Sequence, residues 1–152
     1  MTPVGSIFAP FSDVALLILR VFLGVIFFVH GWLKANLRGI VGGAAGWAKV
    51  LGQMGMPGPV AALLAYSHAW GETIGGILLI LGLLTRVWAV LFGIIMLLAI
   101  FGAKMSRGVP FMAGQNQGTG WEFDSINFAV CLALLVFGPG NLSLDRLLGL
   151  PL

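Results

Sequence analysis

Residues 60–103 read VAALLAYSHAWGETIGGILLILGLLTRVWAVLFGIIMLLAIFGA. Two apolar stretches, 60–84 and 87–103, are separated here only by Thr85 and Arg86. Crossing the hydrocarbon core of a bilayer, roughly 30 Å thick, takes about 20 mostly apolar residues in a helix. We therefore predict two transmembrane helices that are joined by a tight turn at Thr85-Arg86 and run antiparallel to each other.

Two further apolar stretches flank this hairpin, at about 14–31 and about 123–137. A Gly-Pro-Gly segment at 138–140 ends the last stretch, as strong helix breakers do. The link between the first two spans contains Trp-Ala-Lys-Val-Leu at 47–51, which we interpret as a short interfacial helix with an aromatic anchor. The sequence thus predicts an all-α fold, an integral membrane four-helix bundle forming a single transmembrane domain over residues 1–152.

The composition supports a membrane protein. Of the 152 residues, 59% are hydrophobic and only 9% are charged, and the mean hydropathy is +1.05. A soluble domain carries about a quarter of its residues as charged side chains. The net charge of +3 comes from few residues, with no basic stripe of the kind that follows nucleic-acid phosphates. The expected surroundings are a lipid bilayer, and no nucleic acid is expected to bind.

Two charged residues lie deep within predicted spans. Glu72 is about 12 residues, or roughly 18 Å, into the second span, and Arg20 is about seven residues into the first. Because an unpaired charge in a bilayer is costly, we predict that Arg20 and Glu72 face each other at a common depth, directly or through a shared ligand or water. The alternatives are that Arg20 extends to the membrane surface and that Glu72 is protonated and hydrogen-bonded to a neighbouring helix.

The residues around Glu72 indicate that its face of the helix is packed. Gly71, Gly75 and Gly76 are small enough to let a second helix approach closely. His68 precedes Glu72 by one helical turn and either hydrogen-bonds to it, tuning its proton affinity, or is structural.

Polar residues also gather at one predicted membrane face. His30 and Lys34 end the first span, and Glu122 and Asp124 begin the fourth. In an antiparallel bundle these ends meet, so we predict contacts between the two groups and a polar mouth leading past His68. The alternative is ordinary interfacial charge pairing, which contributes little energy.

No self-contained catalytic motif is present. The chain has no zinc-ligand spacing, phosphate-binding loop, dinucleotide fingerprint or serine-nucleophile motif. Its single cysteine, Cys131, excludes CxxC redox chemistry. The candidate residues for ligand binding or proton relay are Arg20, His30, Lys34, His68, Glu72 and Glu122.

Several segments, in this order and spacing, resemble the DoxX family. They are LRVFLGVIFFVHG at 19–31 with Lys34 beyond it, GETIGGILLILGLLTR at 71–86, Glu122, and GPGNLSLD at 138–145. The resemblance covers about residues 14–148, although the insertion between the first two spans is longer than the compact family pattern.

The resemblance implies a four-helix, multi-pass protein of the prokaryotic inner (plasma) membrane. The family is named after a small subunit of a thiosulfate:quinone oxidoreductase, relatives are linked to redox and oxidative-stress systems, and most members have no assigned reaction. The resemblance therefore implies, at most, the role of an oxidoreductase subunit.

Three hypotheses about function follow. The first is a membrane subunit of a redox or respiratory complex that binds quinone or another apolar ligand near an Arg20–Glu72 layer, without an intrinsic cofactor. The second is a non-catalytic accessory or anchoring subunit of a larger membrane complex or homo-oligomer. The third is a small proton or solute transporter, which the lack of an internal repeat disfavours.

Overall fold

The computed structural model describes residues 9–36, 43–112 and 118–150, and every regular element within these ranges is helical. The prediction of an all-α fold is confirmed. Two helical stretches, Ser12–Ala35 and Thr85–Arg107, are long and apolar enough to cross a membrane. The four-helix bundle itself, the single domain and the antiparallel pairing of the second and third spans stay predictions.

The chain forms two compact units. Unit 1 contains the chain up to Arg20 together with Gly82 and everything that follows it, and unit 2 is Val21–Leu81. The long helix α2 (Ser12–Ala35) therefore contributes its beginning to unit 1 and the rest to unit 2.

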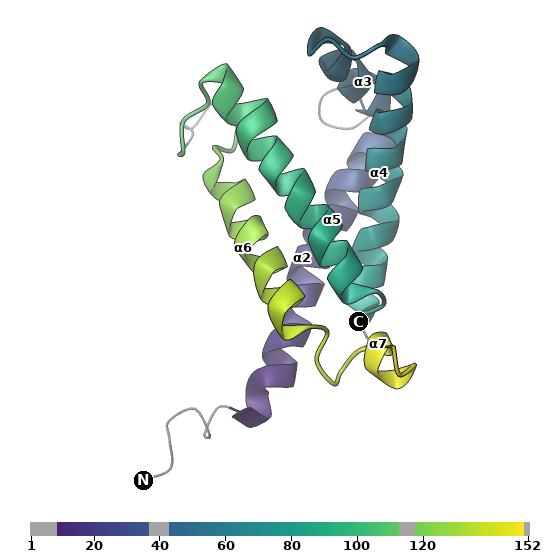
Figure 1. The fold of residues 1–152 in the computed structure, drawn as a ribbon, viewed down its shortest axis with the longest axis vertical. Coiled ribbons are helices and arrows are strands. Elements are labelled where there is room, and N and C mark those ends of the chain that lie inside the picture. Colours follow the sequence, from purple (N-terminus) through teal and green to yellow (C-terminus); the bar gives the residue numbers. More distant parts are fainter. Residues whose placement is uncertain (1–8, 37–42, 113–117, 151–152) are drawn as a thin grey trace. The chain divides into compact units, whose positions relative to one another are not determined.

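Unit 1 is built on two helices that pack against each other and run in opposite directions, α5 and α6 (Figure 1). Phe92 on α5 and Leu134 on α6 are fully buried. The elements of this unit, besides the beginning of α2, are η1 (Ala9–Phe11), α5 (Thr85–Leu97), the π-helical η3 (Leu98–Lys104), η4 (Met105–Arg107), α6 (Glu122–Phe137) and α7 (Leu144–Leu147).

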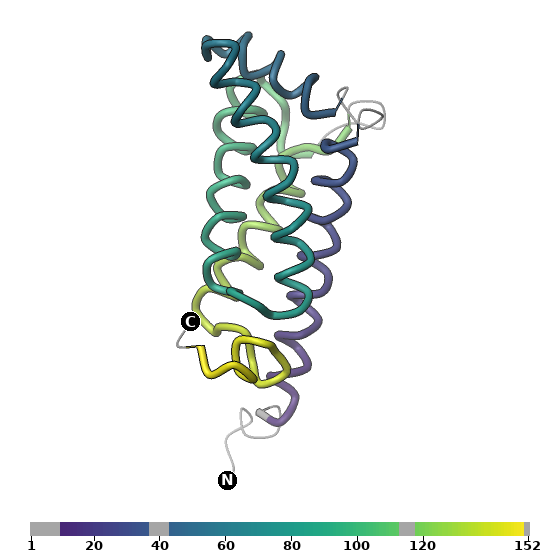
Figure 2. Tube along the Cα trace, turned by 90° about the vertical axis from the view of Figure 1, so that its right-hand side faces the viewer, coloured from purple at the N-terminus to yellow at the C-terminus, as the bar shows by residue number. Residues whose placement is uncertain are grey.

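Unit 2 contains α3 (Gly43–Gln53), α4 (Gly58–Leu81) and the remainder of α2. Figure 2 shows α3 crossing the first turns of α4, instead of running along it. Leu51 of α3 forms a buried cluster with two alanines of α4, and Trp47 packs against this cluster. The short helix predicted at 47–51 is thus confirmed and is longer than expected, while its place at a membrane interface stays a prediction.

Within unit 2, glycines bring the backbones of α2 and α4 into contact. A Cβ atom at Gly76 would lie 2.6 Å from the carbonyl oxygen of Gly24, and one at Gly31 would lie 2.7 Å from that of Ala69. Real Cβ atoms do not approach so closely, so these positions require glycine. Gly71, in contrast, has no described atom within 4 Å of its Cβ position, so its predicted part in helix approach was wrong.

Before α5 begins, the chain turns at Gly82 and Leu84, both of which have positive φ angles, +69° and +57°. The buried carboxylate of Asp145 accepts hydrogen bonds from the backbone N–H groups of Leu84 (2.6 Å) and Thr85 (2.8 Å). In return, the N–H of Asp145 donates to the carbonyl of Gly82 at 2.8 Å. The turn predicted at Thr85-Arg86 was therefore misplaced, because Asp145 caps a helix that already starts at Thr85.

Replacing Gly76 by valine should destabilise the protein by roughly 1–3 kcal/mol, because the new side chain has to displace the backbone of α2. Gly71→Val is the matched control, since it adds the same side chain to the same helix where space is open. Thermal unfolding in detergent would measure both variants. Equal midpoints for Gly76→Val and Gly71→Val would contradict the close packing of α2 on α4.

Asp145→Ala should destabilise unit 1 by roughly 1–3 kcal/mol, since two buried backbone N–H groups lose their acceptor. Asp145→Asn retains one acceptor oxygen and should lie between alanine and wild type. The same unfolding assay would rank the three proteins, and an alanine variant as stable as wild type would show that the cap does not matter.

Candidate functional site

Glu72 is the centre of a group of ionisable side chains in unit 2. Its side chain is only 2% exposed, on a helix that is mostly apolar. The Nζ atom of Lys34 donates to both carboxylate oxygens, at 2.8 Å to Oε1 and 2.7 Å to Oε2. His68 places its Nε2 atom 2.9 Å from Oε1. We call Lys34, His68 and Glu72 the Glu72 cluster.

Local structure explains how the cluster forms. His68 and Glu72 are one turn apart on α4, so their side chains meet on one face of the helix. Gly31 allows α2 to lie directly against this face, because a Cβ there would be 2.7 Å from the Cβ of Glu72. Lys34, one turn further along α2, then reaches the carboxylate with its long side chain.

Lys34 and His68, the two nitrogen-bearing members of the cluster, are partly exposed. The side chain of Lys34 is 26% exposed and that of His68 is 20% exposed, whereas Glu72 lies behind them. Trp47 of α3 contacts the His68 ring edge-on, with ring centroids 6.0 Å apart. The carboxylate is therefore bound by Lys34 and lies beside the partly exposed ring of His68, whose Nε2 atom is itself buried and has no hydrogen-bond partner among the described residues.

Of the Glu72 cluster, Lys34 lies in the last turn of α2, which ends at Ala35. The sequence places Glu72 near the middle of a span by counting from the start of α4. The structure adds that α4 extends past the end of α2 and is crossed there by α3 (Figure 2).

Arg20 has partners other than the predicted Glu72. It is fully buried and belongs to unit 1, where its Nη2 atom donates to the carbonyl of Leu142. Its Nε and Nη1 atoms have no hydrogen-bond partner among the described residues. The sequence pattern did not indicate this contact, because it depends on the C-terminal segment returning to the beginning of α2. Arg20 and Glu72 thus each have contacts within their own unit, and their predicted facing, directly or through a shared ligand or water, stays a prediction.

Two residues of the predicted polar mouth form ion pairs within their own units. Lys34 binds Glu72, and Asp124 binds the Nζ atom of Lys104 at 2.6 Å. Lys104 is the last residue of the π-helical stretch η3. The predicted contacts of Lys34 with Glu122 or Asp124 would join the two units, and they stay a prediction.

Two candidate residues remain, His30 and Glu122. His30 is exposed, with its Nδ1 atom 2.8 Å from the carbonyl of Ile26 on the same helix. Glu122 begins α6, and its buried Oε2 atom has no hydrogen-bond partner among the described residues. Within those residues, no group of three or more His, Cys, Asp or Glu side chains could hold a metal ion.

Comparison with known proteins identifies relatives across most of the chain. A sequence model of the DoxX family matches residues 15–105. A protein of Bacillus subtilis (strain 168) named "Putative oxidoreductase CatD" is 35% identical over 133 residues, covering 88% of this chain and 86% of the relative.

Two proteins of Escherichia coli (strain K12) match as well. "Inner membrane protein YqjF" is 31% identical, covering 90% of this chain and 94% of the relative, and "Inner membrane protein YphA" is 33% identical, covering 91% and 94%. No solved structure matches significantly.

The Lys34–Glu72 pair can be tested with a double-mutant cycle. Lys34→Met and Glu72→Gln should each destabilise the protein, because the first leaves the buried Glu72 carboxylate without its cation and the second leaves the partly exposed Lys34 ammonium without its anion. The double variant should lose less than the sum of the two, with a coupling energy of roughly 0.5–3 kcal/mol. Unfolding midpoints in detergent would measure the cycle, and strictly additive effects would refute the pair.

Proposed function

Because the chain belongs to the DoxX family of membrane proteins, we propose that it is a membrane subunit of a redox system. In this role, the Glu72 cluster binds the carbonyl head of a quinone or of a similar apolar ligand.

The protein resides in the prokaryotic inner membrane. Two relatives are named inner membrane proteins, and two helical stretches of this chain are long and apolar enough to cross a bilayer. We propose that α4 and α6 cross the membrane as well, giving four spans in total. The ligand would then enter from the surrounding lipid.

The observation that carries the proposal is a buried carboxylate with two partly exposed nitrogen-bearing side chains, Lys34 and His68, against it. The ammonium of Lys34 has three N–H groups, of which two point at the oxygens of Glu72. The third N–H and the imidazole of His68 are able to donate to a ligand carbonyl. Glu72 orients both groups. Ionisable residues within membrane spans commonly pair with one another and mark the pathways of substrates and protons.

The chemistry of a quinone fits these groups. Reducing a quinone to the hydroquinone adds two electrons and two protons, one proton to each carbonyl oxygen. Lys34 and His68 would bind one carbonyl and transfer its proton, and the other proton would come from solvent. The electrons would come from a cofactor of a partner protein. That one relative is named a putative oxidoreductase supports a redox setting.

A second candidate is a non-catalytic accessory subunit within a larger membrane complex or homo-oligomer. It is favoured by the contacts of Arg20 and Asp145, two fully buried charged residues that bind backbone groups of their own unit. Charges used in this way stabilise the fold and leave binding to the surface.

Quinone content distinguishes the two candidates. The full chain would be purified in mild detergent from its host membrane, and the extracted quinone would be quantified per protein by mass spectrometry. We expect Lys34→Met and His68→Gln each to lower the amount of quinone per protein at least about 5-fold, which corresponds to roughly 1 kcal/mol of binding free energy. Lys104→Met is the matched control, because it removes another half-buried lysine from a carboxylate.

Equal quinone content in wild type and Lys34→Met, with both proteins folded, would refute the ligand site. If none of the proteins carries quinone and all retain the same protein partner, the accessory role is the correct one.

A further inference from the structure

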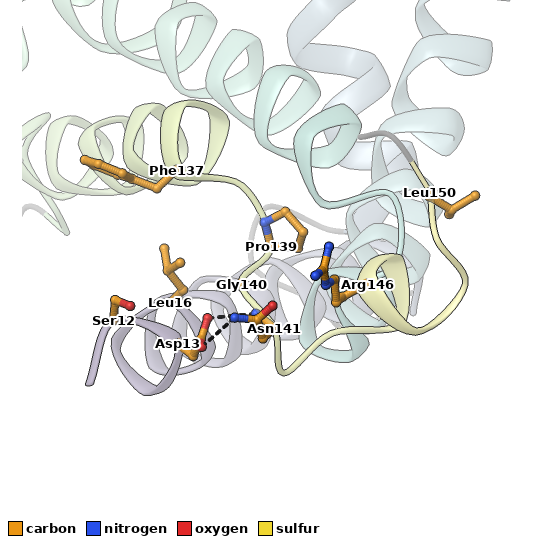
Figure 3. Close-up of a pocket in the computed structure, with 9 residues that line it drawn as sticks. All are labelled: Ser12, Asp13, Leu16, Phe137, Pro139, Gly140, Asn141, Arg146 and Leu150. Atoms are coloured by element: carbon orange, nitrogen blue, oxygen red, sulfur yellow. Dashed lines mark hydrogen bonds between the residues drawn. The ribbon is translucent and has the colours of Figure 1, made fainter. Parts of the chain in front are cut away.

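A pocket of about 450 Å³ lies in unit 1, where the beginning of α2 meets the segment that follows α6 (Figure 3). This volume lies within the range of small-molecule sites. None of the residues of the Glu72 cluster belongs to it. Its lining consists of Ser12, Asp13, Leu16, Phe137, Pro139, Gly140, Asn141, Arg146 and Leu150.

The acidic side of the pocket is held in a fixed position. The two carboxylate oxygens of Asp13 accept hydrogen bonds from the backbone N–H and the side-chain Nδ2 of Asn141, each at 2.8 Å (Figure 3). A carboxylate has about four lone-pair sites, so roughly two remain for a ligand. Asp13 is thus an oriented acceptor with unused capacity.

The basic side of the pocket is Arg146. In Figure 3, Arg146 and Asp13 are drawn on opposite sides of Asn141. The backbone N–H of Arg146 donates to the side chain of Ser143, whereas the Arg146 guanidinium makes no hydrogen bond to any of the residues that the structure describes. The positive charge of Arg146 also acts on the Asp13 carboxylate. A guanidinium that makes no hydrogen bond presents five N–H donors in a fork that matches the oxygens of a phosphate. The pocket therefore offers one cation and one anion on separate walls.

The pocket lies at the depth of the lipid headgroups. Ser12 and Asp13 are the first residues of the candidate span Ser12–Ala35, and a span starts where the hydrocarbon core gives way to the polar layer. Phe137, which is 71% exposed, and Leu16 add apolar surface beside the charged residues. Apolar and charged groups at one mouth suit a ligand that is itself amphipathic.

We infer that this pocket binds the headgroup of a zwitterionic phospholipid that carries a primary ammonium. The phosphodiester binds Arg146, and the ammonium binds Asp13. A purely anionic headgroup has no cationic group that could pair with the carboxylate of Asp13. A choline headgroup has no N–H to donate to that carboxylate. The site discriminates between headgroups through these two opposite charges.

The test uses the purified full chain in detergent mixed with equal amounts of phosphatidylethanolamine, phosphatidylcholine and phosphatidylglycerol, with bound lipid counted by native mass spectrometry. Wild type should retain phosphatidylethanolamine at least about 5-fold over the other two. Arg146→Gln should lower its retention about 5-fold. Asp13→Asn should abolish the preference over phosphatidylcholine.

The matched control is Arg107→Gln, which removes an exposed arginine of unit 1 away from the pocket and should leave the lipid profile unchanged. Because the Arg146 side chain has no hydrogen-bond partner in the described structure, its replacement should not alter folding, and this variant decides the test even if Asp13→Asn misfolds.

Soluble phosphoethanolamine carries the same charged groups without acyl chains. It should fail to displace the lipid at equal concentration, and displacement would overturn the assignment to a membrane lipid. A lipid profile that is the same in wild type and Arg146→Gln would overturn the site altogether.

Discussion

The structure of unit 2 depends on neutralising one buried carboxylate. Glu72 is 2% exposed on an apolar helix, and an isolated charge there would cost several kcal/mol. Lys34 compensates it with two short hydrogen bonds, and this requires α2 to lie directly against α4. Gly31 and Gly76 make that approach possible. The ion pair and the glycine contacts therefore depend on each other.

Unit 1 satisfies its buried polar groups in a different way. Asp145 accepts from backbone N–H groups at the start of α5, and Arg20 donates to the carbonyl of Leu142. Both contacts join residues far apart in the sequence, and they tie the C-terminal segment to α2 and to the start of α5. In an environment with little water, backbone groups at helix ends need such partners. The C-terminal segment is thus a structural part of the unit.

Hydropathy predicted the long helices well, because each of the four long apolar stretches forms a helix whose ends lie close to the predicted bounds. The His68–Glu72 contact also followed from helical spacing, and the structure contains it at 2.9 Å. The partners of Lys34 and Arg20 could not be predicted in the same way. They depend on helix rotation and on the course of the C-terminal segment, which hydropathy does not encode. Gly71 and Gly76 look equivalent in the sequence, and only the packing of α2 distinguishes them.

The separation of Lys34 from Glu72 also has a consequence for biosynthesis. The two residues are 38 positions apart. At about 5–20 residues per second, the ribosome adds Glu72 roughly 2–8 s after Lys34. During that interval α2 carries a lysine whose partner does not yet exist. Lys34 lies in the last turn of α2 and is 26% exposed even in the folded unit, so its ammonium can stay hydrated during that interval. When Glu72 is added, its counter-ion is already part of the chain, so the order of synthesis favours the more deeply buried charge.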